Sequence, residues 1–398
     1  MRIGIDIRPL QKTSRYRGIG SYLRNLVNVL TLNDYENEYV FYSLRNATPL
    51  NLREYYPHLC EDKIKKWIEH PLYRPKRPER LHWFWDRLFL HKALNKDNID
   101  LFHSNEITSW PSHFSAKRYK YVVTVHDMIP FVFWNSYKNT YSFDYRFALK
   151  QGLHLLKKTD MIISPSETTK RDILKYVDIP PNRIKVIYEG VQHNLLPLDK
   201  PEARRIIEKE YGIKDNYILY IGGADFRKNI HNLLVGFGRF LERHHTMHSL
   251  VLAGEVFGRT YLSEVKAVFE SIEKLRLEKH IKVLGFISDQ YINYLYSGAD
   301  LFVFPSLYEG FGLPVLEAMA CGTPVVTSHV SSLPEIAGNA ALLIDPHNVD
   351  NIANAIYNVL IDNVLRKDLI HKGLERAKQF TWEKTARETL AVYKGLVQ

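Results

Sequence analysis

The chain has 398 residues, 45% of them hydrophobic and 25% charged, as is ordinary for a soluble globular protein of two or three domains. Its net charge of +10 arises in the first half, because residues 1–200 carry 32 Lys and Arg against 21 Asp and Glu. The chain has only two cysteines, Cys60 and Cys321, which excludes a disulfide framework and favours a reducing compartment. It shows neither a signal peptide nor a stretch of ~20 apolar residues, which predicts a cytoplasmic protein.

The chain opens with a predicted strand over Ile3–Ile7, a basic glycine-bearing loop over Lys12–Gly20 and a helix from about Ser21 to Leu30. The loop contains GxGxxL, which lacks the third glycine of a nicotinamide fingerprint. The next strand, Tyr39–Tyr42, ends without the acidic residue that would bind a ribose. These departures argue against an NAD site.

Residues 63–94 combine nine Lys and Arg with several aromatic residues, a mixture that suits an anionic membrane interface. Nucleic acid, a phosphate-linked acceptor or simply a basic soluble surface would also account for the charge of this half. Four apolar residues of the segment have helical spacing, which favours a face packed on its own domain: Leu81, Trp85, Leu88 and Phe89. Its Pro71–Pro78 part is expected to lack regular structure.

Short apolar runs alternate with helical segments through the rest of the chain, which predicts two parallel sheets in an α/β protein. The Glu189–Pro201 stretch is the expected linker between the two sheets. Ser166 is expected to cap a helix that runs to Lys175, and a further helix is expected over Trp382–Val397. The further predicted strands are 100–103, 121–125, 160–164, 184–188, 217–221, 250–254, 281–284, 301–304, 324–327 and 341–344.

The most informative stretch is 301–328, LFVFPSLYEGFGLPVLEAMACGTPVVTS. Its strand is followed by the loop 307–313 and then by a helix that Pro314 begins and Gly322 ends. The loop therefore lies at the carboxyl end of a parallel strand, where open α/β sheets bind ligands. Its glycines, free N–H groups and helix dipole favour an anion such as phosphate.

Two acids flank this predicted phosphate site, Glu309 in the loop and Glu317 in the first helical turn if the helix begins at Pro314. Carboxylates repel phosphate, so they are better suited to accepting hydrogen bonds from hydroxyl groups. Phosphate with hydroxyl groups on both sides describes a sugar nucleotide. Taken alone, the pair would more often be a solvated loop acid and a first-turn helix acid.

Paired cations, Arg227 and Lys228, follow the glycines Gly222 and Gly223 after another strand, as in a phosphate clamp. Taken alone, they would be a solvated helix start. His126 and Asp127 follow a predicted strand, where a lone histidine is usually structural. Three more histidines form a cluster at the end of a predicted helix. That cluster lacks a further metal ligand, so an exposed helix end is preferred for His244, His245 and His248.

Several motifs together resemble retaining glycosyltransferases of family 4, which have the GT-B fold. The resemblance rests on GIDIRPL, RGIGSY, TVHDMIP, GGADFRKN, GFIS, the EGFGLPVLEAMACGTPVV stretch with its two acids, and the final TW-containing helix. It implies two Rossmann-like doubly wound parallel-sheet domains that face each other across a cleft. Residues 1–195 would bind the acceptor, 196–380 would bind the nucleotide sugar, and 381–398 would form a helix that crosses back to the first domain.

The resemblance also assigns roles to matching residues. His126 would lie against the donor sugar with Asp127 as its support, while the cations would compensate the departing diphosphate and Gly285, Phe286 and Ile287 would contact the nucleobase. The implied catalytic residues are His126, Arg227, Lys228 and Glu309. The implied donor-binding residues are Gly18, Gly20, Asp127, Gly222, Gly223, Gly285, Phe286, Ile287, Gly310, Phe311, Gly312, Leu313 and Glu317.

The implied reaction moves a sugar from a nucleotide diphosphate to a glycan or lipid-linked acceptor with retention at the anomeric carbon. Mannose from GDP-mannose is the first expectation, and rhamnose or a UDP-sugar is the alternative. No Asp-x-Asp occurs, so no metal or other cofactor is expected. A sugar-nucleotide epimerase and a non-enzymatic basic binding protein are the rivals from other classes. Nucleic acid is not an expected partner, and peripheral contact of residues 63–94 with the inner membrane face is the alternative to their packing on the first domain.

Overall fold

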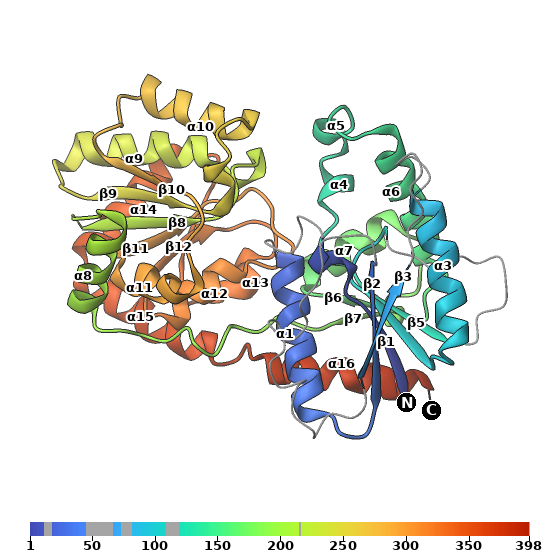
Figure 1. The fold of residues 1–398 in the computed structure, drawn as a ribbon. Helices are drawn as coiled ribbons and strands as arrows, with labels where there is room; N and C mark the ends of the chain where they lie inside the picture. Colours follow the sequence, from blue (N-terminus) through green and yellow to red (C-terminus); the bar gives the residue numbers. More distant parts are fainter. Residues whose placement is uncertain (12–17, 45–66, 73–81, 109–118, 215, 398) are drawn as a thin grey trace. The chain divides into compact units, whose positions relative to one another are not determined.

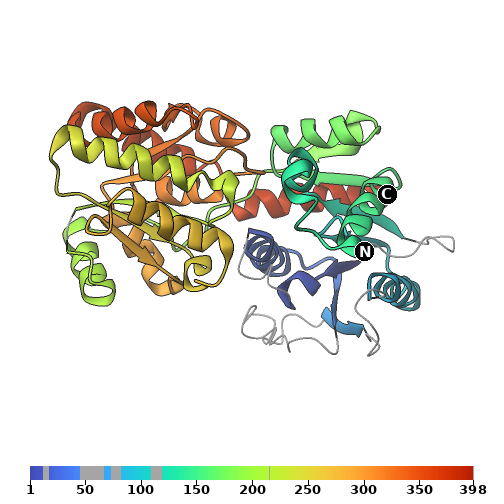
Figure 2. The same ribbon diagram turned by 90° about the horizontal axis from the view of Figure 1, so that it is seen from above.

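The computed structural model describes residues 1–11, 18–44, 67–72, 82–108, 119–214 and 216–397 (Figure 1). The chain forms two compact units. The first contains Met1–Gly190 and Trp382–Gln398, and the second contains Val191–Thr381. Both units are parallel sheets with helices on both faces (Figure 2). None of the helices in the described ranges is long and apolar enough to cross a membrane.

The first unit is built on a seven-stranded sheet with the order β3-β2-β1-β4-β5-β6-β7. Its inner strands are buried apolar runs, as a sheet covered on both faces requires. The strands are β1 (Arg2–Asp6), β2 (Glu38–Leu44), β3 (Trp67–Leu72), β4 (Leu101–Ser104), β5 (Lys120–Thr124), β6 (Met161–Ser164) and β7 (Ile184–Val186).

The helices of this unit pack in two layers. One core cluster joins α1 and α16 to the sheet, and a second joins α3, α6 and α7 to its other face. In the first layer, Tyr22 of α1 meets Trp382 of α16 edge to face at 5.8 Å between ring centroids. The helices are α1 (Gly18–Asn33), α3 (His82–Lys96), α4 (Ile129–Val132), α5 (Trp134–Tyr137), α6 (Phe143–Leu156), α7 (Glu167–Tyr176) and α16 (Trp382–Val397), with short 3₁₀ turns η1 (Arg8–Gln11) and η5 (Pro181–Arg183).

The second unit has a six-stranded sheet with the order β10-β9-β8-β11-β12-β13. Its strands are β8 (Tyr217–Ile221), β9 (Ser249–Ala253), β10 (Ile281–Leu284), β11 (Leu301–Phe304), β12 (Val325–Ser328) and β13 (Leu342–Ile344). Its helices are α8 (Lys200–Tyr211), α9 (Ile230–His244), α10 (Ser263–Lys274), α11 (Asp289–Gly298), α12 (Leu313–Ala320), α13 (Leu333–Ala337), α14 (Val349–Ile361) and α15 (Asn363–Ala377), with 3₁₀ turns η6 (Phe226–Lys228) and η7 (Glu255–Gly258). In Figure 1, α9, α10 and α14 lie on one side of this sheet and α8, α11, α12 and α15 on the other.

Three sequence expectations about elements are corrected. Helix α1 begins at Gly18, three residues earlier than expected, so Gly18 and Gly20 lie in its first turn and not in a loop. Helix α12 begins at Leu313, which puts Glu317 beyond its first turn. Pro71 lies within β3, an unpredicted strand, and is tolerated there because β3 is at the edge of the sheet.

The helix expected near the end of segment 63–94 is α3, and several of its described side chains pack on the sheet. Leu90, Ala93 and Leu94 belong to the core cluster of that face. The side chains of Leu81, Trp85 and Leu88 lie outside the described residues, so the choice between a packed face and a membrane face for them stays open.

Candidate functional site

Three strand ends of the second unit meet at one edge of its sheet. Gly254, directly after β9, has φ +154°, and its N–H donates to the carbonyl of Gly285 after β10 at 3.2 Å. A Cβ added to Gly254 would collide with the backbone carbonyl of Gly222 after β8. The loops after these strands are thus in direct backbone contact. Only glycine permits this approach. The contacting loops form a platform at the edge where parallel sheets bind ligands.

Substituting Gly254 with alanine should therefore disrupt the platform. The added methyl group must push the β8 loop away, so we expect the free energy of unfolding to fall by about 1–3 kcal/mol. Urea unfolding measures this, and Gly258→Ala is the matched control because a Cβ there would meet nothing within 4 Å. Equal effects of the two substitutions would contradict the argument.

The loop after β11 is shaped for a helix start. Gly312 caps α12 in a left-handed conformation with φ +116°, and a Cβ there would lie 2.9 Å from Leu333. Pro314 stands within the first turn, where it is preorganised for the helix. The amino end of α12 therefore lies directly after Gly310–Gly312, as the sequence predicted.

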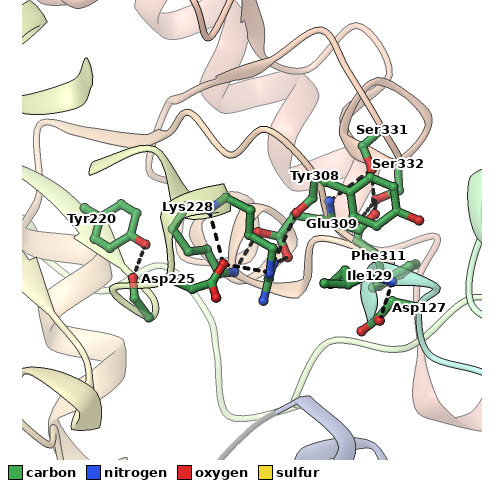
Figure 3. A network of polar contacts seen from close by, with 12 residues as sticks. Asp127, Ile129, Tyr220, Asp225, Lys228, Tyr308, Glu309, Phe311, Ser331 and Ser332 are labelled. Atoms are coloured by element: carbon green, nitrogen blue, oxygen red, sulfur yellow. Dashed lines mark hydrogen bonds and ion pairs between the residues drawn. The ribbon is translucent and has the colours of Figure 1, made fainter. Parts of the chain in front are cut away.

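Two cations converge on Glu309 at this edge. Lys228 Nζ lies 2.6 Å from Glu309 Oε1, and Arg227 Nη1 lies 3.3 Å from Oε2 and 3.2 Å from the carbonyl of Tyr308. Asp225 holds the guanidinium from the other side, with its Oδ1 3.3 Å from Arg227 Nε. Figure 3 shows Lys228 and Glu309 pointing toward one another. The sequence predicted Arg227, Lys228 and Glu309 as site residues, but it did not predict that Glu309 pairs with both cations.

The backbone fastens these cations to the loop. The carbonyl of Arg227 accepts from the N–H of Leu307 at 2.7 Å. Asn229, in a left-handed conformation with φ +60°, donates from Nδ2 to the carbonyls of Pro305 at 3.1 Å and Pro346 at 2.7 Å. Turn η6 and the β11 loop are therefore one rigid assembly.

Burial and charge act in opposite directions on this cluster. Burial raises the pKa of Glu309, but the nearby Lys228 and Arg227 outweigh it and lower the pKa below its ordinary value of 4.5. Burial also lowers the pKa of Lys228, against the opposing pull of Glu309. Because the two groups are 2.6 Å apart and a second cation lies beside the carboxylate, we assign an ionised pair.

The lowered pKa predicts a pH dependence of stability. Since the folded-state pKa is below the unfolded one, the ion pair contributes fully above about pH 4.5 and is lost as the pH falls through the folded-state value. The stability difference between the wild type and Glu309→Gln should thus be largest above pH 4.5 and narrow below it. Urea midpoints measured from pH 7 to pH 3.5 test this, and a constant difference would contradict it.

Two serines that the sequence did not single out hold the same loop. Ser331 accepts from the N–H of Glu309 at 3.0 Å and donates to its carbonyl at 2.6 Å. Ser332 donates to the carbonyls of Glu309 at 3.0 Å and Phe311 at 2.6 Å. Ser331 adopts φ +61°, an uncommon conformation for serine. Figure 3 shows both serines beside the loop. Their sequence signal, SS before Leu-Pro-Glu, is too common in loops to be recognised.

The remaining predicted residues of this unit differ in exposure. Phe286 is 61% exposed after β10, whereas Ile287 is buried. Phe311 is buried and meets Phe380 edge to face at 6.1 Å. Glu317 accepts a hydrogen bond from the hydroxyl of Tyr296 at 2.9 Å. Tyr220 beneath the site donates to the carbonyl of Gly223 at 2.7 Å.

In the first unit, the predicted residues His126 and Asp127 follow β5. His126 Nδ1 lies 3.5 Å from Oε1 of the buried Glu189, and Asp127 accepts from the N–H of Ile129 at 2.9 Å, which starts α4. An acid that faces the His126 ring is thus Glu189, which the sequence assigned to the linker, and the support of His126 by Asp127 stays a prediction. Gly18 and Gly20 lie at the amino end of α1.

The histidines 244, 245 and 248 are spread over the end of α9 and the turn that follows. His244 stacks on Tyr357 at 3.7 Å, His245 is the C-cap and His248 Nε2 lies 3.6 Å from Asp300. Within the described ranges, no three or more His, Cys, Asp or Glu side chains are grouped so that they could hold a metal ion.

Two Rossmann-like units, one with cations and a glycine loop at its strand ends, define an α/β protein of the GT-B class. Solved structures share this fold over the whole chain. Sucrose-phosphate synthase from Thermosynechococcus elongatus covers 100% of this chain and 99% of its own at a TM-score of 0.76 and 21% identity. The HepE protein of Anabaena in complex with UDP and glucose covers 99% and 100% at a TM-score of 0.75 and 17% identity.

Two family models match consecutive parts of the chain. "Glycosyltransferase Family 4" matches residues 16–195, and "Glycosyl transferases group 1" matches residues 203–376. The chain therefore belongs to the glycosyltransferases of family 4, as the sequence motifs indicated.

Two relatives at the sequence level are named as mannosyltransferases. O-antigen chain mannosyltransferase B of Escherichia coli is 35% identical over 62% of this chain and 64% of its own length. Serotype-specific mannosyltransferase WbdA of the same species is 28% identical over 70% of this chain but only 34% of its own length. This chain thus spans less than two thirds of the length of either relative.

Proposed function

We propose that the protein is a mannosyltransferase that moves mannose from GDP-mannose to a glycan or lipid-linked glycan acceptor of a surface polysaccharide. The observation that carries this proposal is the cluster of Arg227, Lys228 and Glu309 beside the glycine loop and the amino end of α12. Such a site suits a diphosphate that has hydroxyl groups beside it. The names of the relatives support mannose as the sugar.

The cation–carboxylate contacts suggest how charge is handled. An arriving diphosphate would compete with Glu309 for Lys228 and Arg227, and these cations together with the amino end of α12 would stabilise its negative charge. The bond between the anomeric carbon and the diphosphate oxygen breaks, the acceptor oxygen bonds to that carbon, and the acceptor proton passes to the leaving diphosphate. Retention at the anomeric carbon and independence from metal belong to this proposal and rest on the family resemblance.

A thermal-shift panel of GDP-mannose, dTDP-rhamnose and UDP-glucose tests the donor. A ligand that binds only the folded protein at 100 times its Kd adds about 2.7 kcal/mol of stability, so GDP-mannose should raise the Tm most. A larger increase in Tm with dTDP-rhamnose or UDP-glucose would identify that compound as the donor in place of GDP-mannose. No increase in Tm with any of the three would contradict the proposal.

An epimerase would change the nucleotide sugar without an acceptor, so incubation with GDP-mannose alone followed by chromatography separates that alternative. A basic nucleic-acid-binding protein would instead bind oligonucleotides in a salt-sensitive manner.

We also propose peripheral contact of residues 63–94 with the inner face of the cytoplasmic membrane, on the strength of their basic and aromatic composition. Co-sedimentation with vesicles of anionic lipid tests that contact.

A further inference from the structure

Glu189 is a buried acid in the segment that follows β7 in the first unit. Only 5% of the residue is exposed, and its ion-pair partner is His126 at 3.5 Å. The backbone beside it is fixed, because the carbonyl of Tyr188 accepts from Thr385 Oγ1 at 2.7 Å. Buried carboxylates are costly unless they are paired, so this position calls for a specific role.

The chemistry of the two groups sets the position of the proton. An ionised carboxylate only accepts hydrogen bonds, so the contact is attractive when His126 carries its proton on Nδ1. Within the part of the chain that the structure describes, His126 Nε2 is buried and has no hydrogen-bond partner. The contact between Nδ1 and Glu189 therefore decides which ring nitrogen of His126 carries the proton.

A second contact holds the plane of the ring. Tyr22 of α1 meets His126 edge to face at 4.7 Å, with an interplanar angle of 82°. The Tyr22 hydroxyl is in turn 3.1 Å from Thr124 Oγ1, which lies 2.8 Å from His103 Nε2. Tyr22 thus fixes the orientation of the imidazole but offers it no acceptor, which leaves the choice of tautomer to Glu189.

We propose that Glu189 is a positioning residue that keeps His126 in the Nδ1–H tautomer. The effect on turnover rests on the proposed function, in which His126 lies against the donor sugar. The tautomer of His126 does not depend on that function, so an experiment can refute the tautomer or the proposed function without refuting the other. The sequence gives no hint of the pair, because the two residues are 63 positions apart and Glu189 follows a strand as an ordinary loop acid.

The test uses the full chain with ¹⁵N-labelled histidine, and His126→Gln identifies the signals of His126. Nitrogen chemical shifts distinguish Nδ1–H from Nε2–H. We expect Nδ1–H in the wild type, and a loss of that preference in Glu189→Met, which keeps the length of the side chain but has no acceptor oxygen. Glu189→Gln retains an acceptor oxygen and should keep the Nδ1–H tautomer.

Glu38→Gln is the matched control, since Glu38 begins β2, which β1 and β4 separate from β5 in the same parallel sheet, and pairs with Arg2 at 3.4 Å. It should leave the His126 signals unchanged. Nε2–H in the wild type, or the same tautomer in the wild type and Glu189→Met, would overturn the proposal. The wild-type spectrum alone decides the first point if Glu189→Met fails to fold.

Kinetics provide the functional readout once a donor is known. Glu189→Met should lower kcat by about tenfold or more, which corresponds to ~1.4 kcal/mol in the activation barrier, while KM for the donor changes less. Glu189→Gln should recover most of kcat. A chain without transferase activity but with the expected tautomer change would contradict the proposed function and leave the role of Glu189 intact. Normal kcat in Glu189→Met would remove the functional role.

Discussion

Substituting Glu309 with glutamine should reduce kcat by about 10²- to 10³-fold, the effect of removing one preorganised charged group from an active site. Glutamine keeps the size of the side chain but cannot form ion pairs with Lys228 and Arg227. The serines would still hold the backbone of the loop, because their bonds are to the N–H and carbonyl of residue 309. The variant should therefore still fold at neutral pH, although loss of the ion pairs lowers its free energy of unfolding, and its main defect should be in turnover.

The measurement is nucleotide release from GDP-mannose in the presence of an acceptor, with circular dichroism to verify the fold. Glu264→Gln, at an exposed position in the first turn of α10, is the control for a Glu to Gln change and should be normal. Activity of Glu309→Gln within a few-fold of the wild type would remove Glu309 from the mechanism.

Substituting Lys228 with methionine should weaken both donor binding and the folded state. The side chain of Lys228 is only 12% exposed, and its ammonium lies 2.6 Å from Glu309 and 4.9 Å from the ring centroid of Phe304. Loss of one charged hydrogen bond to a phosphate costs about 1.5–3 kcal/mol, or roughly 10- to 150-fold in Kd. Leaving a buried carboxylate with one cation fewer should lower the free energy of unfolding by about 3 kcal/mol.

Calorimetric titration with GDP-mannose and urea unfolding measure the two effects. The double variant Lys228→Met, Glu309→Gln separates them, because removing both charges should restore much of the stability and none of the affinity. Additive losses of stability would show that Lys228 and Glu309 do not act as a pair, and an unchanged Kd in Lys228→Met would exclude the diphosphate role.

The sequence predicted the fold well because buried parallel strands are apolar runs that are easy to recognise. The run Leu301–Phe304 is β11 and Tyr217–Ile221 is β8 without adjustment. Ser166 caps α7 as expected, since its Oγ accepts from the N–H of Thr169. Local signals of this kind need no knowledge of the rest of the chain. The start of α1 was misplaced because glycines near a helix start read equally well as loop.

The long-range contacts of the site could not be predicted in the same way. Lys228 and Glu309 are 81 residues apart, so their mutual pairing follows only from the order in which β8 and β11 lie side by side. The same is true of Ser331 and Glu309, which β12 brings together. Motif resemblance selected residues by type and position, whereas their partners depend on tertiary structure.

Hydrogen exchange with and without GDP-mannose tests the location of the donor site most directly. We predict slower exchange at the strand ends of the second unit, over residues 222–229, 285–287 and 307–313, where backbone N–H groups would face the diphosphate and the base. Protection confined to other parts of the chain, in a protein whose Tm the same ligand raises, would contradict this account of the site.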